Sequence, residues 1–310
     1  MPEKRGIEPS AAAETGTRGI SLRVLLAALR PKQWVKNGLV FAALVFSHDL
    51  FDAEQFARTV LGFLIFCLLS SAAYVFNDLM DRDQDRGHPE KGRRPIAAGR
   101  IPVPAATGIC IGLALVGLAG AWLIRSSFGI VALTYLVLNL GYSLVLKHVV
   151  IVDVMILSSG FMLRLFAGAA IIDAHMSSWF IICTILLSLF LGLGKRRQEI
   201  VHLGDRASEH RSVLSQYTPY VLDQMIAVVT ASALISYAIY TISEQTIEKF
   251  GTEKLVLTLP FVLYGIFRYL YLIHGKGKGD SPSTLMVEDV PMVINGILYL
   301  LAVVLIIYTV

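Results

Sequence analysis

The sequence places its densest group of chemically active side chains directly after an apolar stretch. Residues 61–76 contain no charged side chain, and the next nine residues, 77–85, read NDLMDRDQD. Carboxylate and amide oxygens are the ligands that Mg²⁺ prefers in proteins. The loop that follows, 86–100, is rich in Arg and Lys, which bind phosphate oxygens. The two segments together predict a site in which acids hold Mg²⁺ and cations hold a phosphorylated substrate.

The spacing of the acids predicts that they share one face if the chain is helical there. At about 100° per residue, Asn77 lies about 40° to one side of Asp81, whereas Asp85 and Asp78 lie about 40° and 60° to the other. Asp83 points to the opposite side. Because like charges on one helix face repel, neutralising one acid is expected to relieve strain unless a cation lies among them. The alternative, a solvated helix end, explains two acids better than four.

The composition predicts a membrane protein that positions this site. The chain has 310 residues, of which 55% are hydrophobic and 16% charged, and its mean hydropathy is +0.65. A bilayer core needs about 20 apolar residues per helix, and no segment alternates as a membrane β-strand does. We therefore expect an all-α bundle of about nine transmembrane helices. The predicted spans are 35–50, 57–77, 103–124, 127–146, 149–171, 177–194, 221–243, 255–273 and 290–309.

The distribution of Lys and Arg predicts the orientation of these spans. With the N-terminus in the cytosol, the cytosolic segments contain 21 Lys and Arg residues and the outer loops contain 4. By the positive-inside rule, the acidic cluster lies at the cytosolic side of a cell membrane and the C-terminus lies outside. Residues 1–20 are predicted to be a disordered cytosolic tail, and 21–310 a single transmembrane domain. The segment 21–37 is expected to lie along the cytosolic interface.

The acidic segment and the basic loop resemble two signatures of the UbiA-type prenyltransferase superfamily, NDxxDxxxD and RPxxxG. A third element of that family, YxxxK, has a counterpart in YSLVLK at 142–147, with one extra residue. The positions that carry the resemblance are Asn77, Asp78, Asp81, Asp85, Arg94, Pro95, Gly99, Tyr142 and Lys147. The resemblance implies a nine-helix bundle with a cytosolic-side cavity, and Mg²⁺ held by Asp78, Asp81 and Asp85.

One departure from the family pattern bears on the substrate. Members that use a prenyl diphosphate carry a second DxxxD motif, but here that place reads GLGKRRQEI, with Glu199 as its only acid. A cationic segment there favours a prenyl monophosphate held without a second metal. The segments 30–37, 77–99, 142–153 and 194–200 are similar to one subgroup, the decaprenyl-phosphate phosphoribosyltransferases. This similarity implies transfer of phosphoribose from phosphoribosyl pyrophosphate (PRPP) to a polyprenyl phosphate, with release of pyrophosphate.

The predicted site extends beyond the acidic cluster. Asp153 is an ionisable residue one turn into an apolar run, where such groups are usually functional, and we expect it to stabilise a cationic ribose. Arg164 is deeper, and we interpret it as a buried structural partner. The predicted catalytic residues are Asp78, Asp81, Asp85 and Asp153. The predicted substrate-binding residues are Lys36, Asn37, Asn77, Arg94, Tyr142, Lys147, Lys195, Arg196 and Glu199. The sequence leaves a homo-oligomer open, and no nucleic-acid motif is present.

Two other functions stay open from the sequence. An aromatic prenyltransferase that uses a prenyl diphosphate shares the first motif, although the missing second motif counts against it. A transporter or lipid-binding scaffold without chemistry would have little use for convergent Mg²⁺ ligands, and no inverted repeat typical of transporters is evident.

Overall fold

The computed structural model describes residues 20–88, 90–203, 212–275 and 288–309, and all regular structure within these residues is helical. The predicted all-α fold is therefore confirmed. The predicted disordered tail, 1–20, lies outside the described residues apart from Ile20.

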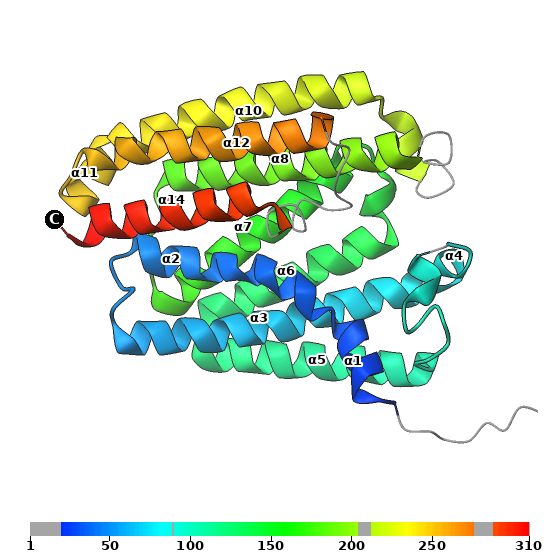
Figure 1. Ribbon diagram of the computed structural model, residues 1–310. Coiled ribbons are helices and arrows are strands. Elements are labelled where there is room, and N and C mark those ends of the chain that lie inside the picture. Colours follow the sequence, from blue (N-terminus) through cyan, green and yellow to red (C-terminus); the bar gives the residue numbers. More distant parts are fainter. Residues whose placement is uncertain (1–19, 89, 204–211, 276–287, 310) are drawn as a thin grey trace, which may run out of the picture.

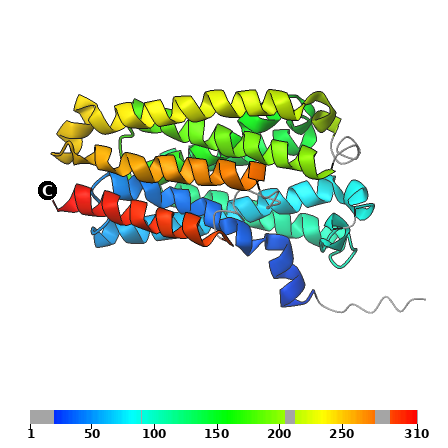
Figure 2. The same cartoon turned by 45° about the horizontal axis from the view of Figure 1, so that its top comes forward.

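Eight helices in the described ranges are long and apolar enough to cross a membrane. They are α3 (Ala53–Met80), α5 (Val103–Ile124), α6 (Ser126–Leu144), α7 (Val152–Ile172), α8 (Ser178–Leu203), α10 (Pro219–Ile242), α12 (Leu259–Gly275) and α14 (Val290–Tyr308). The seventh of them reaches membrane length together with the 3₁₀-helix η6 (Lys254–Thr258), which leads directly into α12. Figures 1 and 2 show them side by side in one bundle. The C-terminal end of α14 lies at one end of the bundle, and the short helix α4 (Arg82–Arg86) lies at the other. The chain is a multi-pass membrane protein.

The predicted count of nine spans is not confirmed, because the first predicted span is broken. Residues 35–39 lie in a 3₁₀-helix, η1 (Pro31–Leu39), residues 40–46 form a seven-residue α-helix, α2 (Val40–Phe46), and residues 47–50 lie in neither. Neither reaches the length of about 20 residues that a bilayer core requires. A separate helix, α1 (Leu22–Leu29), precedes them.

The helix α8 is longer than the sequence predicted. It continues to Leu203, nine residues beyond the predicted end of the membrane span at 194, so the segment KRRQEI is helical. Lys, Arg, Gln and Glu are all good helix formers. The first charge therefore marks the predicted membrane boundary, not the end of the helix.

Short polar residues fix where several helices begin. The side-chain oxygens of Asp52, Thr218 and Asp289 accept hydrogen bonds from backbone N–H groups in the first turns of α3, α10 and α14. Such caps satisfy donors that have no partner within the helix. Proline also stands in the first turn of α10 and α14, where its missing N–H costs nothing.

Close packing holds α3 and α7 near the broken first segment. Among the eight spans, α3 is the most buried and α5 the least. A Cβ atom at Gly168 of α7 would lie 2.1 Å from the carbonyl oxygen of Val40, so only glycine lets α2 approach this closely. Small residues serve the same purpose at other membrane-helix contacts. The polar end of η1 is thereby brought against both α3 and α7.

Candidate active site

The acidic segment bends at Asp81, which corrects the continuous helix assumed from the sequence. The helix α3 ends at Met80, and α4 begins at Arg82. Backbone hydrogen bonds nevertheless keep a four-residue register through the bend, from Asp81 N to Asn77 O at 2.9 Å and from Asp85 N to Asp81 O at 2.8 Å. The side chain of Asp83 is 81% exposed, as predicted for the opposite face.

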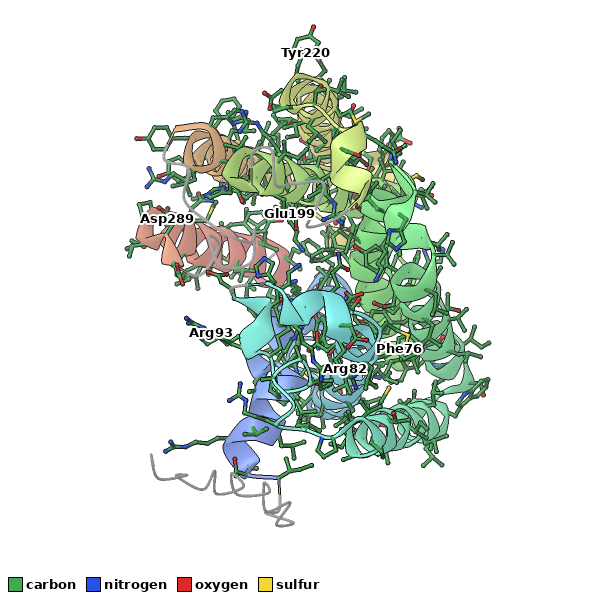
Figure 3. All side chains as sticks on the ribbon, turned by 90° about the vertical axis from the view of Figure 1, so that its right-hand side faces the viewer. Phe76, Arg82, Arg93, Glu199, Tyr220 and Asp289 are labelled. Atoms are coloured by element: carbon green, nitrogen blue, oxygen red, sulfur yellow. The ribbon has the colours of Figure 1, made fainter. Side chains whose placement is uncertain are left out.

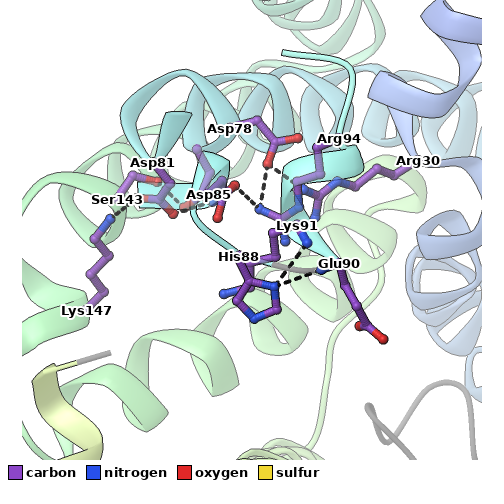
Figure 4. Close-up of polar contacts among 11 residues, drawn as sticks. Arg30, Asp78, Asp81, Asp85, His88, Glu90, Lys91, Arg94, Ser143 and Lys147 are labelled. Atoms are coloured by element: carbon purple, nitrogen blue, oxygen red, sulfur yellow. Dashed lines mark hydrogen bonds and ion pairs between the residues drawn. The ribbon is translucent and has the colours of Figure 1, made fainter. Parts of the chain in front are cut away.

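A single arginine joins two of the acids. Nη1 of Arg94 donates to Oδ1 of Asp78 at 3.1 Å and to Oδ2 of Asp85 at 2.6 Å. Nη2 of Arg30 donates to the same oxygen of Asp78 at 2.5 Å. Figure 4 shows these three contacts around the end of α3. Asp78 and Asp85 are both buried, so their charges rely on these donors rather than on water.

The third acid pairs with a different part of the chain. Asp81 accepts hydrogen bonds from Lys147 Nζ and, at 3.0 Å, from Asn77 Nδ2. Ser143 Oγ in turn donates to Oδ1 of Asn77 at 3.2 Å. Lys147 lies in η3 (Leu146–His148), directly after α6. The end of α3 is therefore fastened to the end of α6, as Figure 4 shows for Ser143 and Lys147.

Three cations thus neutralise three acids, which removes the repulsion that the sequence suggested. In the described part of the chain, no three His, Cys, Asp or Glu residues are placed so that they could already hold a metal ion. The donor set still fits Mg²⁺, because it consists of oxygens alone. Arg94 also puts a positive nitrogen between Asp78 and Asp85, which marks a place where both carboxylates reach one cation. Burial raises the pKa of Asp85 above its ordinary value, and Arg94 opposes that shift.

A second buried cluster surrounds Asp153 at the start of α7. Arg196 Nε donates to Oδ2 of Asp153 at 2.6 Å, and the hydroxyl of Tyr217 donates to Oδ1 at 2.8 Å. The other nitrogens of Arg196 reach Glu199 Oε2 at 2.5 Å and the hydroxyl of Tyr142 at 3.1 Å. Asp153 and Arg196 are fully buried. Arg196 therefore joins three other predicted site residues, Tyr142, Asp153 and Glu199.

Asn37 connects η1, in which it lies, with α3 and α7. Its amide donates to Ser70 Oγ at 3.1 Å and accepts from Arg164 Nε at 2.7 Å. Arg164 also donates to the hydroxyl of Tyr135, and its guanidinium lies over the ring of Phe66. The interpretation of Arg164 as a buried structural partner fits these contacts. Direct contact between Asn37 and a substrate stays a prediction, since its side chain is fully buried.

The side chains of Lys36 and Lys195 lie close enough for their charges to interact. In the described residues no hydrogen-bond or ion-pair partner of Lys36 is found, whereas Lys195 Nζ lies 3.8 Å from Oε1 of Glu199. Burial, followed by the charges of Lys195, Arg164 and Arg30, lowers the pKa of Lys36 to about 7. A side chain in this position gains from an anion beside it. Figure 3 looks onto this end of the bundle, where Glu199 lies toward the centre and Asp289 at the periphery.

Sequence reasoning missed three contributors to these clusters. Arg30 precedes Pro31 within the segment 21–37, whose basic residues indicate a membrane interface as readily as a site. Ser143 follows Tyr142 directly in the sequence, but its contact with Asn77 was not predicted. Tyr217 is 64 residues from Asp153 along the chain, and nothing in the local sequence marks it.

Comparison with known proteins identifies one family and a group of similar full-length relatives. The model of the UbiA prenyltransferase family matches residues 38–295. A decaprenyl-phosphate phosphoribosyltransferase of Corynebacterium glutamicum is 32% identical over 92% of this chain and 86% of its own length. The protein of that name from Mycobacterium tuberculosis is 32% identical over 84% of this chain and 87% of its own.

Solved structures share the fold at lower identity. A UbiA homologue from Archaeoglobus fulgidus bound to GPP and Mg²⁺ superposes with a TM-score of 0.71 and 21% identity, covering 92% of this chain and 99% of that one. A digeranylgeranylglyceryl phosphate synthase structure gives a TM-score of 0.64 and 17% identity, over 93% and 99%. The likeness supports the fold assignment.

Proposed function

Because the chain belongs to the UbiA prenyltransferase family, we propose that it transfers 5-phosphoribose from PRPP to a polyprenyl phosphate and releases pyrophosphate. The main support is the full-length similarity to proteins named for this reaction. The segment at 195–197 adds to it, because it presents Lys and Arg where relatives that use a prenyl diphosphate have a second acidic motif.

We assign the donor to the end of α3. Asp78, Asp81 and Asp85 would hold Mg²⁺, which when bound would neutralise charge on the departing pyrophosphate. Arg94 and Lys147 pair with these acids in the structure. Once the acids bind Mg²⁺, both cations would be free to bind phosphate oxygens of the donor. Asn77 would hold Asp81 in position through its amide.

We assign the acceptor phosphate to Lys36 and Lys195. Arg196 is fully buried among Asp153, Glu199 and Tyr142. Its role would therefore be to hold these side chains in position rather than to contact the lipid directly. Lys36 is only half-buried. A lysine without an anionic partner is a suitable ligand for a phosphate that carries about two negative charges.

The chemistry requires little from the protein beyond placement and charge. An oxygen of the lipid phosphate forms a bond to C1 of the ribose, and the bond from C1 to the pyrophosphate oxygen breaks, with its electron pair leaving on pyrophosphate. The attacking phosphate is already ionised at neutral pH, so no strong general base is needed. Positioning and neutralisation of the leaving group would supply most of the rate. Contact between Asp153 and the ribose stays a prediction.

The location of the site is part of the proposal. The bias of Lys and Arg along the sequence favours a cytosolic site in the cell membrane, with the C-terminus outside. PRPP is water-soluble and would enter from the cytosol, whereas the lipid would enter from the bilayer. A homo-oligomer is compatible with these assignments.

A two-arm assay tests the substrate. The purified protein in detergent with Mg²⁺ receives either radiolabelled PRPP and a polyprenyl phosphate, or a prenyl diphosphate and 4-hydroxybenzoate. Labelled lipid in the first arm alone is the expected result. Product in the second arm alone would favour an aromatic prenyltransferase, and product in neither would oppose both.

A further inference from the structure

Arg30 occupies a strained point of the backbone between α1 and η1. Its φ of 54° and ψ of 59° lie in the left-handed region, which is unfavourable for a residue other than glycine. Its backbone N–H ends α1 by bonding to the carbonyl of Leu26, and Pro31 begins η1. Glycine is the usual residue at such a helix end. The arginine must therefore be explained by what its side chain contacts.

The side chain of Arg30 reaches α3 at the edge of the acidic cluster. Its guanidinium bonds to Asp78 at 2.5 Å and lies 5.3 Å from the ring centre of Tyr74. One turn earlier, Ser71 Oγ donates to the carbonyl of the residue before Arg30 at 2.9 Å and accepts from Trp34 Nε1 at 3.1 Å. These contacts follow one face of α3. The junction of α1 and η1 is thus clamped beside Asp78, and Figure 4 shows Arg30 reaching in from it.

The two arginines around Asp78 share one oxygen. Arg30 and Arg94 both donate to Oδ1 of Asp78. A divalent cation on that carboxylate would place positive charge beside two guanidinium groups, which is unfavourable unless an anion arrives with it. A pyrophosphate group supplies that anion, and guanidinium groups match phosphate oxygens well. Removal of the Arg30 charge should therefore weaken the binding of metal with pyrophosphate but not the binding of metal alone.

We propose that Arg30 is a phosphate-binding residue of the donor site, held by Asp78 until Mg²⁺ and the pyrophosphate group of the donor are bound together. Without ligand, Arg30 balances the charge of a buried acid. With ligand, it donates to a phosphate oxygen. The identity of the donor rests on the proposed function, whereas the role of Arg30 requires only a metal–pyrophosphate ligand.

Binding measurements on the purified protein test this role without turnover. Inorganic pyrophosphate with Mg²⁺ is titrated by calorimetry, and Mn²⁺ alone, a cation that takes similar oxygen ligands, is titrated by electron paramagnetic resonance. Arg30→Gln should weaken pyrophosphate binding about 10- to 100-fold, the effect of one charge-assisted hydrogen bond. The same variant should bind Mn²⁺ alone as tightly as the wild type or more tightly.

Two further variants separate this role from a structural one. Arg23→Gln removes a cation from the exposed face of α1 and should change neither titration. Arg30→Lys keeps the charge and should recover part of the pyrophosphate affinity. Equal weakening of both ligands by Arg30→Gln, or unchanged pyrophosphate binding, would overturn the inference.

A further titration with PRPP, together with the transfer assay, distinguishes failure of the inference from failure of the proposed function. If the wild type binds pyrophosphate but not PRPP, the proposed donor is wrong, and the Arg30 comparison still decides the role of that residue. If Arg30→Gln binds pyrophosphate normally while the wild type transfers phosphoribose, the Arg30 inference is wrong and the proposed function stands.

Discussion

Replacing Asp78 by asparagine removes the carboxylate that two arginines share. From sequence alone, neutralising an acid in this cluster was expected to relieve repulsion, but Arg30 and Arg94 lie 2.5 and 3.1 Å from Oδ1 of Asp78. Charge-assisted hydrogen bonds contribute about 1.5–3 kcal/mol each. Both arginine side chains are 25% exposed, so water weakens these contacts, and we expect Asp78→Asn to lower the free energy of unfolding by about 2–3 kcal/mol.

This loss should be visible as a thermal shift and as lost activity. A change of 1 kcal/mol shifts Tm by about 2–4 °C in domains of 150–250 residues, so Tm should fall by several degrees in detergent. Turnover with PRPP and polyprenyl phosphate should disappear while the variant stays folded at assay temperature. Asp83→Asn is the matched control, because its side chain is 81% exposed, and it should change neither quantity. Full activity in Asp78→Asn, or equal effects at both positions, would refute the reasoning.

Three other predictions follow from the remaining contacts. Lys195→Ala should raise the KM for polyprenyl phosphate about 10- to 100-fold and leave the KM for PRPP unchanged, whereas Arg94→Ala should do the reverse; the opposite pattern would exchange the two phosphate sites. A pKa of about 7 means that Lys36 is charged below pH 7 and neutral above it. The KM for the lipid should therefore rise about fivefold from pH 7 to 8 and become flat in Lys36→Arg, and an equal rise in both proteins would contradict the assignment. Tyr217→Phe deprives Asp153 and the N–H of Ile151 of a partner, so chemical denaturation should show a loss of about 1–3 kcal/mol; unchanged stability would mean that the hydroxyl contributes nothing.

The sequence predicted features that depend on local spacing. The register of Asn77, Asp81 and Asp85 follows from helical periodicity, and it survives the bend because the backbone hydrogen bonds continue through it. The outward direction of Asp83 follows from the same periodicity. Seven of the predicted spans were placed within a few residues at both ends, because an apolar run of about 20 residues leaves few alternatives.

The sequence did not predict features that depend on packing between distant segments. Asn37 and Arg164 meet across 127 residues, and Tyr142 and Arg196 across 54. The first pair depends on how η1 approaches α7, and the second on how α6 approaches α8. A glycine such as Gly168 contributes to the first approach, because it lets α2, which follows η1, lie against α7. Pairing of the acids with Arg30, Arg94 and Lys147 was missed for the same reason, and repulsion was predicted where the structure has neutralised charge. The broken first span was missed because hydropathy does not distinguish a 3₁₀-helix from an α-helix.

The most direct test of phosphoribosyl transfer is the stoichiometry of a single reaction. The purified protein is incubated with Mg²⁺, a polyprenyl phosphate and PRPP labelled in the ribose, and both labelled lipid and free pyrophosphate are measured over time. The proposed function predicts one pyrophosphate released for each labelled lipid formed, and neither product after chelation of Mg²⁺ or in Asp78→Asn. Pyrophosphate release without labelled lipid, or the absence of both in a folded wild-type protein, would contradict it.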